Sequence, residues 1–214
     1  LYNGNEYLEG MLGSFKARCA PFNVNYRYVE EELLYLFDNA DAKAVVYHAS
    51  FAPTLARIRE RLTQVRLWLQ VADESGEALL PGALDYEQAL ADAKPDVPEG
   101  LSGDDLYILY TGGTTGMPKG VMWEHSALYR ALGGGGNAVL GEKASDSVEE
   151  QRERIAQEAR GQRLLPACPL MHGTGLFTAI GTISATSTEM LSPGITISVP
   201  SGSVTMPVTS VVRK

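Results

Sequence analysis

The first half of the chain alternates between helical and extended patterns of apolar residues. Residues 6–17 carry apolar side chains at the spacing of one helix face, and residues 28–37 repeat that spacing behind three glutamates in the first turn. By the same patterns, helices are expected at 53–62 and 86–93, and strands at 19–24, 44–47, 65–71 and 106–110. Helices that alternate with short apolar strands predict an α/β fold of partial, mostly parallel sheets flanked by helices.

The second half of the chain carries weaker patterns. Residues 125–132 predict a helix, and residues 149–160 predict a second helix whose charges face solvent. Four consecutive glycines at 133–136 indicate a flexible break between these helices. A short strand is expected at 164–165, and residues 169–175 are expected to form a loop that contains glycines and a histidine.

Composition and charge exclude several classes of protein. The 214 residues are 44% hydrophobic and 21% charged, which is typical of a globular protein and not of a disordered chain, a collagen or a disulfide scaffold. The net charge of −8 argues against a broad nucleic-acid-binding face, and no apolar run approaches the roughly 20 residues of a membrane span. Cys19 and Cys168 indicate free thiols in a reducing compartment, with one disulfide as the alternative. We therefore expect a cytoplasmic location, with peripheral membrane association left open.

The two ends of the chain differ from its middle. The chain begins at Leu1, and its first ten residues lack the basic and apolar regions of a secretory signal, so we expect that it starts inside a longer protein. From Thr178 to Lys214, 14 of 37 residues are Ser or Thr and none is aromatic. This shift in composition sets residues 178–214 apart from the ordinary globular composition of the rest of the chain.

The densest group of candidate functional residues follows the strand that is expected to end at Tyr110. Residues 110–121 read Y-T-G-G-T-T-G-M-P-K-G-V. Glycines let backbone N–H groups approach a ligand, threonines add hydroxyl donors, and Lys119 adds a compact positive charge, so the segment favours binding of a phosphate chain. It is not a Walker A loop, because Lys119 lies between a proline and a glycine, and it lacks the valine expected two residues after the last glycine of a kinase loop.

These twelve residues resemble the phosphate-binding signature of the adenylate-forming (AMP-binding) enzymes, which include acyl-CoA synthetases, peptide-synthetase adenylation domains and luciferase. Residues 16–36, with their N-V-N-Y-R-Y stretch, are similar to fatty-acyl-CoA synthetases, and P-L-M-H-G-T-G at 169–175 resembles the family's next motif. The Met-His-Gly of that motif and G-V-M-W at 120–123 point to synthetases of fatty acids or sterol side chains. The resemblance covers roughly residues 1–181 and implies a part of the large N-terminal domain of these enzymes.

The resemblance implies a reaction in two halves. A carboxylate attacks the α-phosphate of MgATP to give acyl-AMP and pyrophosphate, and the thiol of coenzyme A then displaces AMP. The implied co-substrates are ATP, Mg²⁺ and coenzyme A, and the implied substrate is a fatty or sterol-derived acid. No nucleic acid is expected as a partner, and no residue of the chain is assigned as a metal ligand.

The resemblance also implies roles for individual residues. The side chains expected to hold the β- and γ-phosphates are Thr111, Thr114, Thr115 and Lys119, and the backbone N–H groups are expected from Gly112, Gly113 and Gly116. His172 is the catalytic candidate, because its motif lines or gates the site of the acyl carboxylate and the adenylate. Gly173 and Gly175 are expected to leave room for the substrate.

Other interpretations stay open. The family's later motifs, which hold Mg²⁺, the ribose and a mobile lysine, are not found in the chain, so we expect the chain alone to be inactive. The family pattern ends near residue 182, and residues 182–214 are either a divergent β-rich segment or, the favoured interpretation, the product of a frameshift. The alternatives for function are a non-catalytic nucleotide- or pyrophosphate-binding remnant and another adenylate-forming ligase, such as an aryl-CoA ligase or a peptidyl-adenylating enzyme.

Overall fold

The computed structural model describes residues 1–94, 99–113, 116–136, 141–157, 162–164, 168–185, 188–192 and 195–198. The helices are α1 (Asn5–Lys16), α2 (Glu30–Asn39), α3 (Ala52–Ile58), α4 (Tyr86–Asp92), α5 (His125–Ala131), α6 (Val148–Gln157) and α7 (Gly173–Ala185). The strands are β1 (Ala44–His48), β2 (Leu67–Val71), β3 (Leu84–Asp85), β4 (Leu106–Gly113), β5 (Gly116–Glu124), β6 (Gln162–Leu164), β7 (Thr188–Ser192) and β8 (Ile195–Ser198). Single 3₁₀ turns at Ala49–Phe51 and Arg59–Arg61 flank α3.

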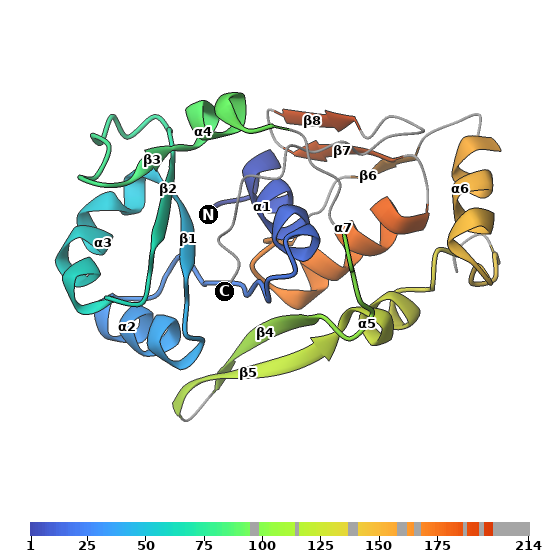
Figure 1. Cartoon of the computed structure of the whole chain (residues 1–214), viewed down its shortest axis with the longest axis horizontal. Helices are drawn as coiled ribbons and strands as arrows, with labels where there is room; N and C mark the ends of the chain where they lie inside the picture. Colours follow the sequence, from blue (N-terminus) through green and yellow to red (C-terminus); the bar gives the residue numbers. More distant parts are fainter. Residues whose placement is uncertain are drawn as a thin grey trace.

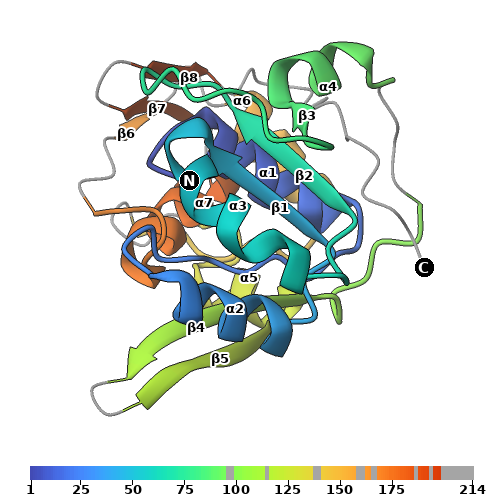
Figure 2. The same cartoon turned by 90° about the vertical axis from the view of Figure 1, so that its left-hand side faces the viewer.

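Helices lie on both faces of the first sheet. Its three strands are parallel in the order β1-β2-β3, with Ala44 opposite Leu67 and His48 opposite Val71. The helices α2 and α3 pack on one face, and α1 lies on the other (Figures 1 and 2). The buried side chains of the first face include Leu36, Phe37, Tyr47, Leu55, Ile58 and Trp68. The predicted α/β fold with parallel strands is therefore confirmed.

A second group of elements surrounds the β4–β5 hairpin. The two strands are antiparallel, from Leu106 opposite Glu124 to the end of the hairpin, and they run along the lower side of Figure 1. The helices α1, α5 and α7 pack on this hairpin through a second cluster of buried side chains, which includes Leu8, Met11, Tyr107, Leu128 and Leu176. A third small sheet joins β6 and β7 in parallel and β7 and β8 in antiparallel pairing.

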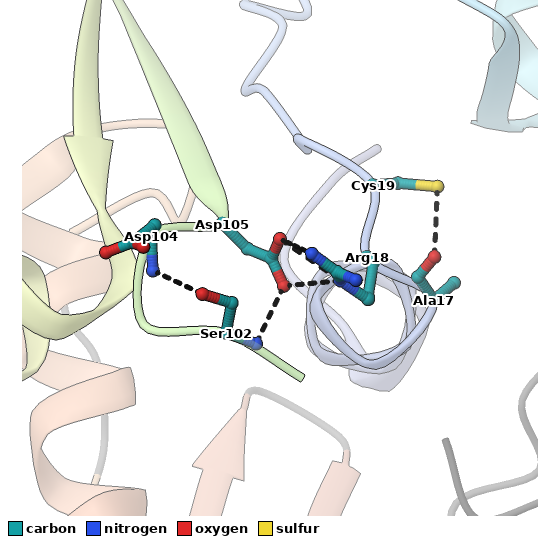
Figure 3. Close-up of polar contacts among 6 residues, drawn as sticks. All are labelled: Ala17, Arg18, Cys19, Ser102, Asp104 and Asp105. Atoms are coloured by element: carbon teal, nitrogen blue, oxygen red, sulfur yellow. Dashed lines mark hydrogen bonds and ion pairs between the residues drawn. The ribbon is translucent and has the colours of Figure 1, made fainter. Parts of the chain in front are cut away.

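An ion pair fixes the start of β4 against the end of α1. Arg18 has a left-handed backbone with φ of 56°, and its guanidinium donates hydrogen bonds of 2.9 to 3.2 Å to both oxygens of Asp105 (Figure 3). The N–H of Ser102 donates to the same carboxylate at 3.2 Å. The Arg18 guanidinium holds the pKa of Asp105 below its usual range. Because Asp105 directly precedes β4, this pair positions the strand that leads to the candidate site.

Several predicted boundaries differ from the structure. The expected strand at 19–24 is reduced to one parallel bridge, between Phe22 and Ile108. The glycines at 133–136 lie between α5 and α6, as predicted, and form a turn whose last three members are buried. Helix α6 ends at Gln157, and residues 158–160 of the predicted helix and residue 165 of the predicted strand lie outside the described residues. Cys19 and Cys168 are free thiols, as predicted. None of the helices in the described ranges is long and apolar enough to cross a membrane.

Candidate functional site

Five of the candidate phosphate-binding residues, Thr111, Gly112, Gly113, Gly116 and Lys119, lie in the strands of a β-hairpin and not in the Gly/Thr-rich loop after Tyr110 that the sequence predicted. Strand β4 continues three residues beyond Tyr110, and β5 begins at Gly116. The expectation failed because glycine has a low strand propensity, so the local sequence reads as a loop. Pairing across the hairpin, with Tyr110 opposite Gly120, supplies the extended conformation instead.

A shift of register shapes the end of the hairpin. The pairing changes by one residue between Thr111 and Gly113, so Gly112 lies opposite two residues of β5, Met117 and Pro118. An extra residue in one strand makes a β-bulge, and a bulge tolerates Pro118 because proline has no N–H to donate to the ladder.

The glycines of the hairpin are of two kinds. A Cβ atom built on Gly112 or Gly116 meets no described atom within 4 Å, and neither residue has a positive φ. Neither packing nor backbone conformation therefore requires glycine at these two positions, and both leave free space beside the backbone. Gly120 differs, because its Cβ would lie 2.8 Å from Cγ2 of Ile108 and 3.1 Å from the ring of Tyr110. Gly112 and Gly116 thus form an open cradle, whereas Gly120 is needed for packing.

Thr111 and Lys119 are opposite each other across the hairpin, and both are exposed. The Thr111 hydroxyl donates to the carbonyl of Lys119 at 3.5 Å, a long hydrogen bond that a ligand could replace. Within the described part of the chain, no carboxylate pairs with the Lys119 ammonium. Its charge is therefore available to an anion. Thr114 and Thr115 lie outside the described residues.

His172 ends a turn that leads directly into α7. Its N–H donates to the carbonyl of Pro169 at 3.0 Å, and its own carbonyl accepts the N–H of Leu176 at 3.1 Å. The side-chain Oδ1 of Asn3 accepts the N–H of Leu170 at 2.8 Å. The backbone of the turn is thus held on both sides, while the His172 side chain is exposed.

The two glycines after His172 do not leave room for a substrate, in contrast to the prediction. A Cβ on Gly175 would lie 2.5 Å from the carbonyl oxygen of Pro169, and a Cβ on Gly173 would lie 3.0 Å from Cδ2 of Leu109. Protein atoms therefore fill the space beside both residues. These glycines let the first turn of α7 pack closely against the preceding turn and against β4.

Asn23 connects the hairpin to the His172 turn, and the sequence interpretation missed it. Its side chain is 6% exposed. Oδ1 accepts the N–H of Tyr110 at 2.9 Å, and Nδ2 donates to the carbonyl of Tyr110 at 3.3 Å and to that of Met171 at 2.5 Å. The available signal was a polar residue between Phe22 and Val24, because a buried amide needs partners.

A second asparagine anchors the same strand residue. The Tyr110 hydroxyl donates to Oδ1 of Asn39, in the last turn of α2, at 2.6 Å. Burial raises the pKa of Tyr110, so its hydroxyl stays protonated and keeps this donor at neutral pH. Tyr110 is thus fixed through its backbone and its side chain immediately before the exposed part of the hairpin.

The described residues suggest no metal site. Across them, no group of three or more His, Cys, Asp or Glu side chains is placed to hold a metal ion. A cavity of about 1190 Å³ lies between α1 and β1, but no residue of the hairpin or of the His172 turn lines it. The candidate site is therefore an exposed surface of glycine backbone, a hydroxyl and an ammonium group.

Comparisons with known proteins relate the chain to one family of enzymes. A family model described as AMP-binding enzyme matches residues 1–200. The medium-chain acyl-CoA ligase Mig of Mycobacterium avium is 47% identical over 188 residues, which are 87% of this chain and 34% of that protein. The 3-oxocholest-4-en-26-oate–CoA ligase of Rhodococcus rhodochrous is 41% identical over 177 residues, 81% of this chain and 32% of that protein. The chain thus spans about a third of the length of the curated relatives that it matches.

Solved structures share the fold. The acetoacetyl-CoA synthetase of Streptomyces lividans matches with a TM-score of 0.66 over 90% of this chain and 28% of that chain. Its sequence identity is 19%, so the likeness concerns the arrangement of helices and strands. The hairpin and the His172 turn both lie within the range that the family model matches.

Proposed function

The chain belongs to the AMP-binding enzyme family, and on this premise we propose that the complete protein is an AMP-forming acyl-CoA synthetase. The names of two relatives, a ligase of medium-chain acids and a ligase of a sterol-derived acid, support a fatty or sterol-derived acid as the substrate. Acyl-AMP and pyrophosphate form in the first half of this reaction, and the thioester of coenzyme A forms in the second.

The observation that carries the proposal is the open glycine cradle beside a free ammonium group. Gly112 and Gly116 have space beside their backbone, and Lys119 lies exposed on the adjoining strand. Such a surface suits the β- and γ-phosphates of ATP, because charge-assisted hydrogen bonds contribute about 1.5–3 kcal/mol each. Thr111 adds a hydroxyl, and we propose the same contribution from Thr114 and Thr115. The N–H of Gly113 completes the proposed set.

In this role the chain's own residues bind and orient, and they make no covalent bond to the substrate. Lys119 stabilises the negative charge that accumulates on the departing pyrophosphate. His172, on its rigid turn, contacts the acyl carboxylate or the adenylate and excludes water from it. Mg²⁺, when bound with ATP, would neutralise phosphate charge, and its ligands would come from residues outside those assigned here.

The proposal predicts pyrophosphate and ATP binding that depends on Lys119. We expect Lys119→Ala to weaken binding of either ligand about tenfold or more, since one charge-assisted hydrogen bond is lost. Isothermal titration calorimetry of the 214-residue chain measures this. Lys94→Ala is the matched control, because Lys94 is exposed and distant in sequence from the hairpin. Equal affinities of the two variants, or a chain that binds neither ligand, would contradict the proposed site.

We further propose that the 214 residues alone do not turn over. The His172 turn and the phosphate hairpin are present, but the chain spans about a third of its relatives. A pyrophosphate-release assay with medium- and long-chain fatty acids is expected to give no signal above background. Turnover comparable to that of a complete synthetase would refute this point. Binding without turnover also fits the alternative of a non-catalytic nucleotide-binding remnant, and activity of the complete protein distinguishes the two.

The division of the chain at residue 181 and the cytoplasmic location stay predictions. The family model matches as far as residue 200, which includes β7 and β8. We propose to read the coding DNA in the other two frames downstream of residue 181. If neither frame encodes the family's later motifs, the frameshift interpretation is wrong.

A further inference from the structure

Asn23 occupies the junction between three segments that are distant in sequence. The backbone of residues 21–22 pairs with β4, where the N–H of Ile108 donates to the carbonyl of Pro21 at 3.0 Å. One step further along, the Asn23 side chain takes over, because its amide binds both the N–H and the carbonyl of Tyr110. The side chain therefore continues the ladder of hydrogen bonds at the point where the two backbones separate.

The same amide reaches the second motif. Its Nδ2 also donates to the carbonyl of Met171, the residue before His172. Tyr110 and Met171 each immediately precede a candidate functional residue, Thr111 in the hairpin and His172 in the turn. The buried Asn23 amide thus contacts the residue that immediately precedes each half of the site.

We propose that Asn23 is a positioning residue that holds the phosphate hairpin and the His172 turn in one fixed arrangement. The catalytic part of this inference rests on the proposed function, in which the hairpin binds the phosphates and the His172 turn contacts the acyl group. Asn23 itself touches neither substrate. Its effect is to place His172 relative to the phosphates, and small errors of placement reduce reaction rates strongly.

Substitution can separate the hydrogen bond that the Asn23 amide accepts from the Tyr110 N–H from the one that it donates to Met171. Asn23→Ala removes the hydrogen bonds to Tyr110 and to Met171. Because a buried hydrogen bond is then lost at the hairpin and at the turn, the amide protons of Tyr110, Leu170 and His172 should exchange about tenfold faster or more. Asn23→Asp at pH 8 keeps an oxygen acceptor for the Tyr110 N–H but loses the donor to the carbonyls of Met171 and Tyr110. In that variant we expect the amide protons of Leu170 and His172 to exchange faster, while the amide proton of Tyr110 stays protected.

Hydrogen exchange of the ligand-free 214-residue chain, read by NMR, measures these effects without any assumption about function. Asn25→Ala is the matched control, because among the described residues the Asn25 side chain binds only the nearby N–H of Arg27. If Asn23→Ala unfolds the whole chain, Asn23→Asp decides the matter. The inference is overturned if the amide protons of Leu170 and His172 exchange no faster in Asn23→Asp than in Asn25→Ala. It is also overturned if exchange of the Tyr110 amide proton in Asn23→Asp is accelerated as much as theirs.

A second measurement tests the link between the two halves. Pyrophosphate, added to the wild-type chain, is expected to slow exchange at Thr111 and Gly112 and also at Leu170 and His172. In Asn23→Ala the slowing should be confined to the hairpin, a selectivity that a general loss of stability does not produce. A wild-type chain that binds no pyrophosphate counts against the proposed function, whereas the ligand-free exchange still decides the role of Asn23.

Discussion

At the scale of single residues, the hairpin shows that identical residues in one motif serve different purposes. Gly112 has open space beside it, whereas Gly120 lies under the side chains of Ile108 and Tyr110. A motif read from sequence treats the two alike, because both are glycines a few residues from a lysine. Only the cross-strand register, with Gly120 opposite Tyr110, separates the ligand cradle from the packing contact.

This difference predicts opposite effects of one substitution at two positions. Gly120→Ala should destabilise the chain by about 1–3 kcal/mol, because the added methyl group overlaps Ile108 and Tyr110. Gly112→Ala should leave the free energy of unfolding nearly unchanged but weaken pyrophosphate binding. Urea denaturation and calorimetric titration of both variants measure the two quantities. Loss of stability in Gly112→Ala equal to that in Gly120→Ala would show that both glycines are packing residues.

Asn23 marks the limit of sequence reasoning at this scale. Thr111 and Lys119 were identifiable, because their chemistry and spacing lie within one short segment. The partners of Asn23 lie 87 and 148 residues away, and no local pattern reports such contacts. A buried amide is visible in the sequence only as an interruption of an apolar segment.

At the scale of elements, helices and parallel strands followed from the sequence better than the hairpin did. Helices α1 and α2 begin and end within two residues of their predicted bounds, because an apolar stripe and an acidic first turn are local features. Strand β5 was missed, because its first five residues include two glycines and a proline. Helix α7 was missed, because its first residues are Gly-Thr-Gly, which read as a loop.

The glycines of α7 allow a test of that packing. Alanine normally stabilises a helix relative to glycine by about 0.5–1 kcal/mol, and Gly181→Ala should do so, because its nearest contact would be an ordinary 3.5 Å from the carbonyl of Leu132. Gly175→Ala should instead destabilise by about 1–3 kcal/mol, since its Cβ would lie 2.5 Å from the carbonyl oxygen of Pro169. Thermal and urea unfolding of both variants measure the signs. Two stabilising substitutions would contradict the close packing of α7 on the turn.

At the scale of the whole molecule, two buried clusters meet along β4. One surrounds the first sheet and includes Tyr110, and the other contains Tyr107 with α1, α5 and α7. A histidine lies close to each cluster, and of the two His48 is buried and His125 is half-buried. His48 accepts the N–H of Tyr2 at 3.1 Å, and the His125 ring packs against Phe15 with ring centroids 4.4 Å apart.

These two histidines predict how stability depends on pH. Burial lowers the pKa of His48 and of His125, and the nearby Asp105 opposes the second shift only in part. The unfolded chain then binds more protons than the folded chain just below pH 6.5, so the free energy of unfolding should fall as the pH drops through that range. Depressed pKa values of Asp73 and Asp105 should cause a further loss below about pH 4.

Urea denaturation between pH 8 and pH 3 measures both steps. His48→Gln removes one titrating group and should flatten the upper step. A free energy of unfolding that increases between pH 7 and pH 5 would contradict the burial of these imidazoles.

The hydrogen bonds of Asn23 also have a consequence for folding during synthesis on the ribosome. Met171, whose carbonyl accepts the hydrogen bond from Asn23 Nδ2, is made 148 residues later than Asn23 itself. At about 5–20 residues per second, the amide waits about 7 to 30 s for that partner during synthesis. The first sheet and the hairpin can form in this interval, but the turn before His172 can dock only after it. The phosphate hairpin is therefore synthesised before the turn, and the hydrogen bond from Asn23 that links the two can form only once Met171 has been made.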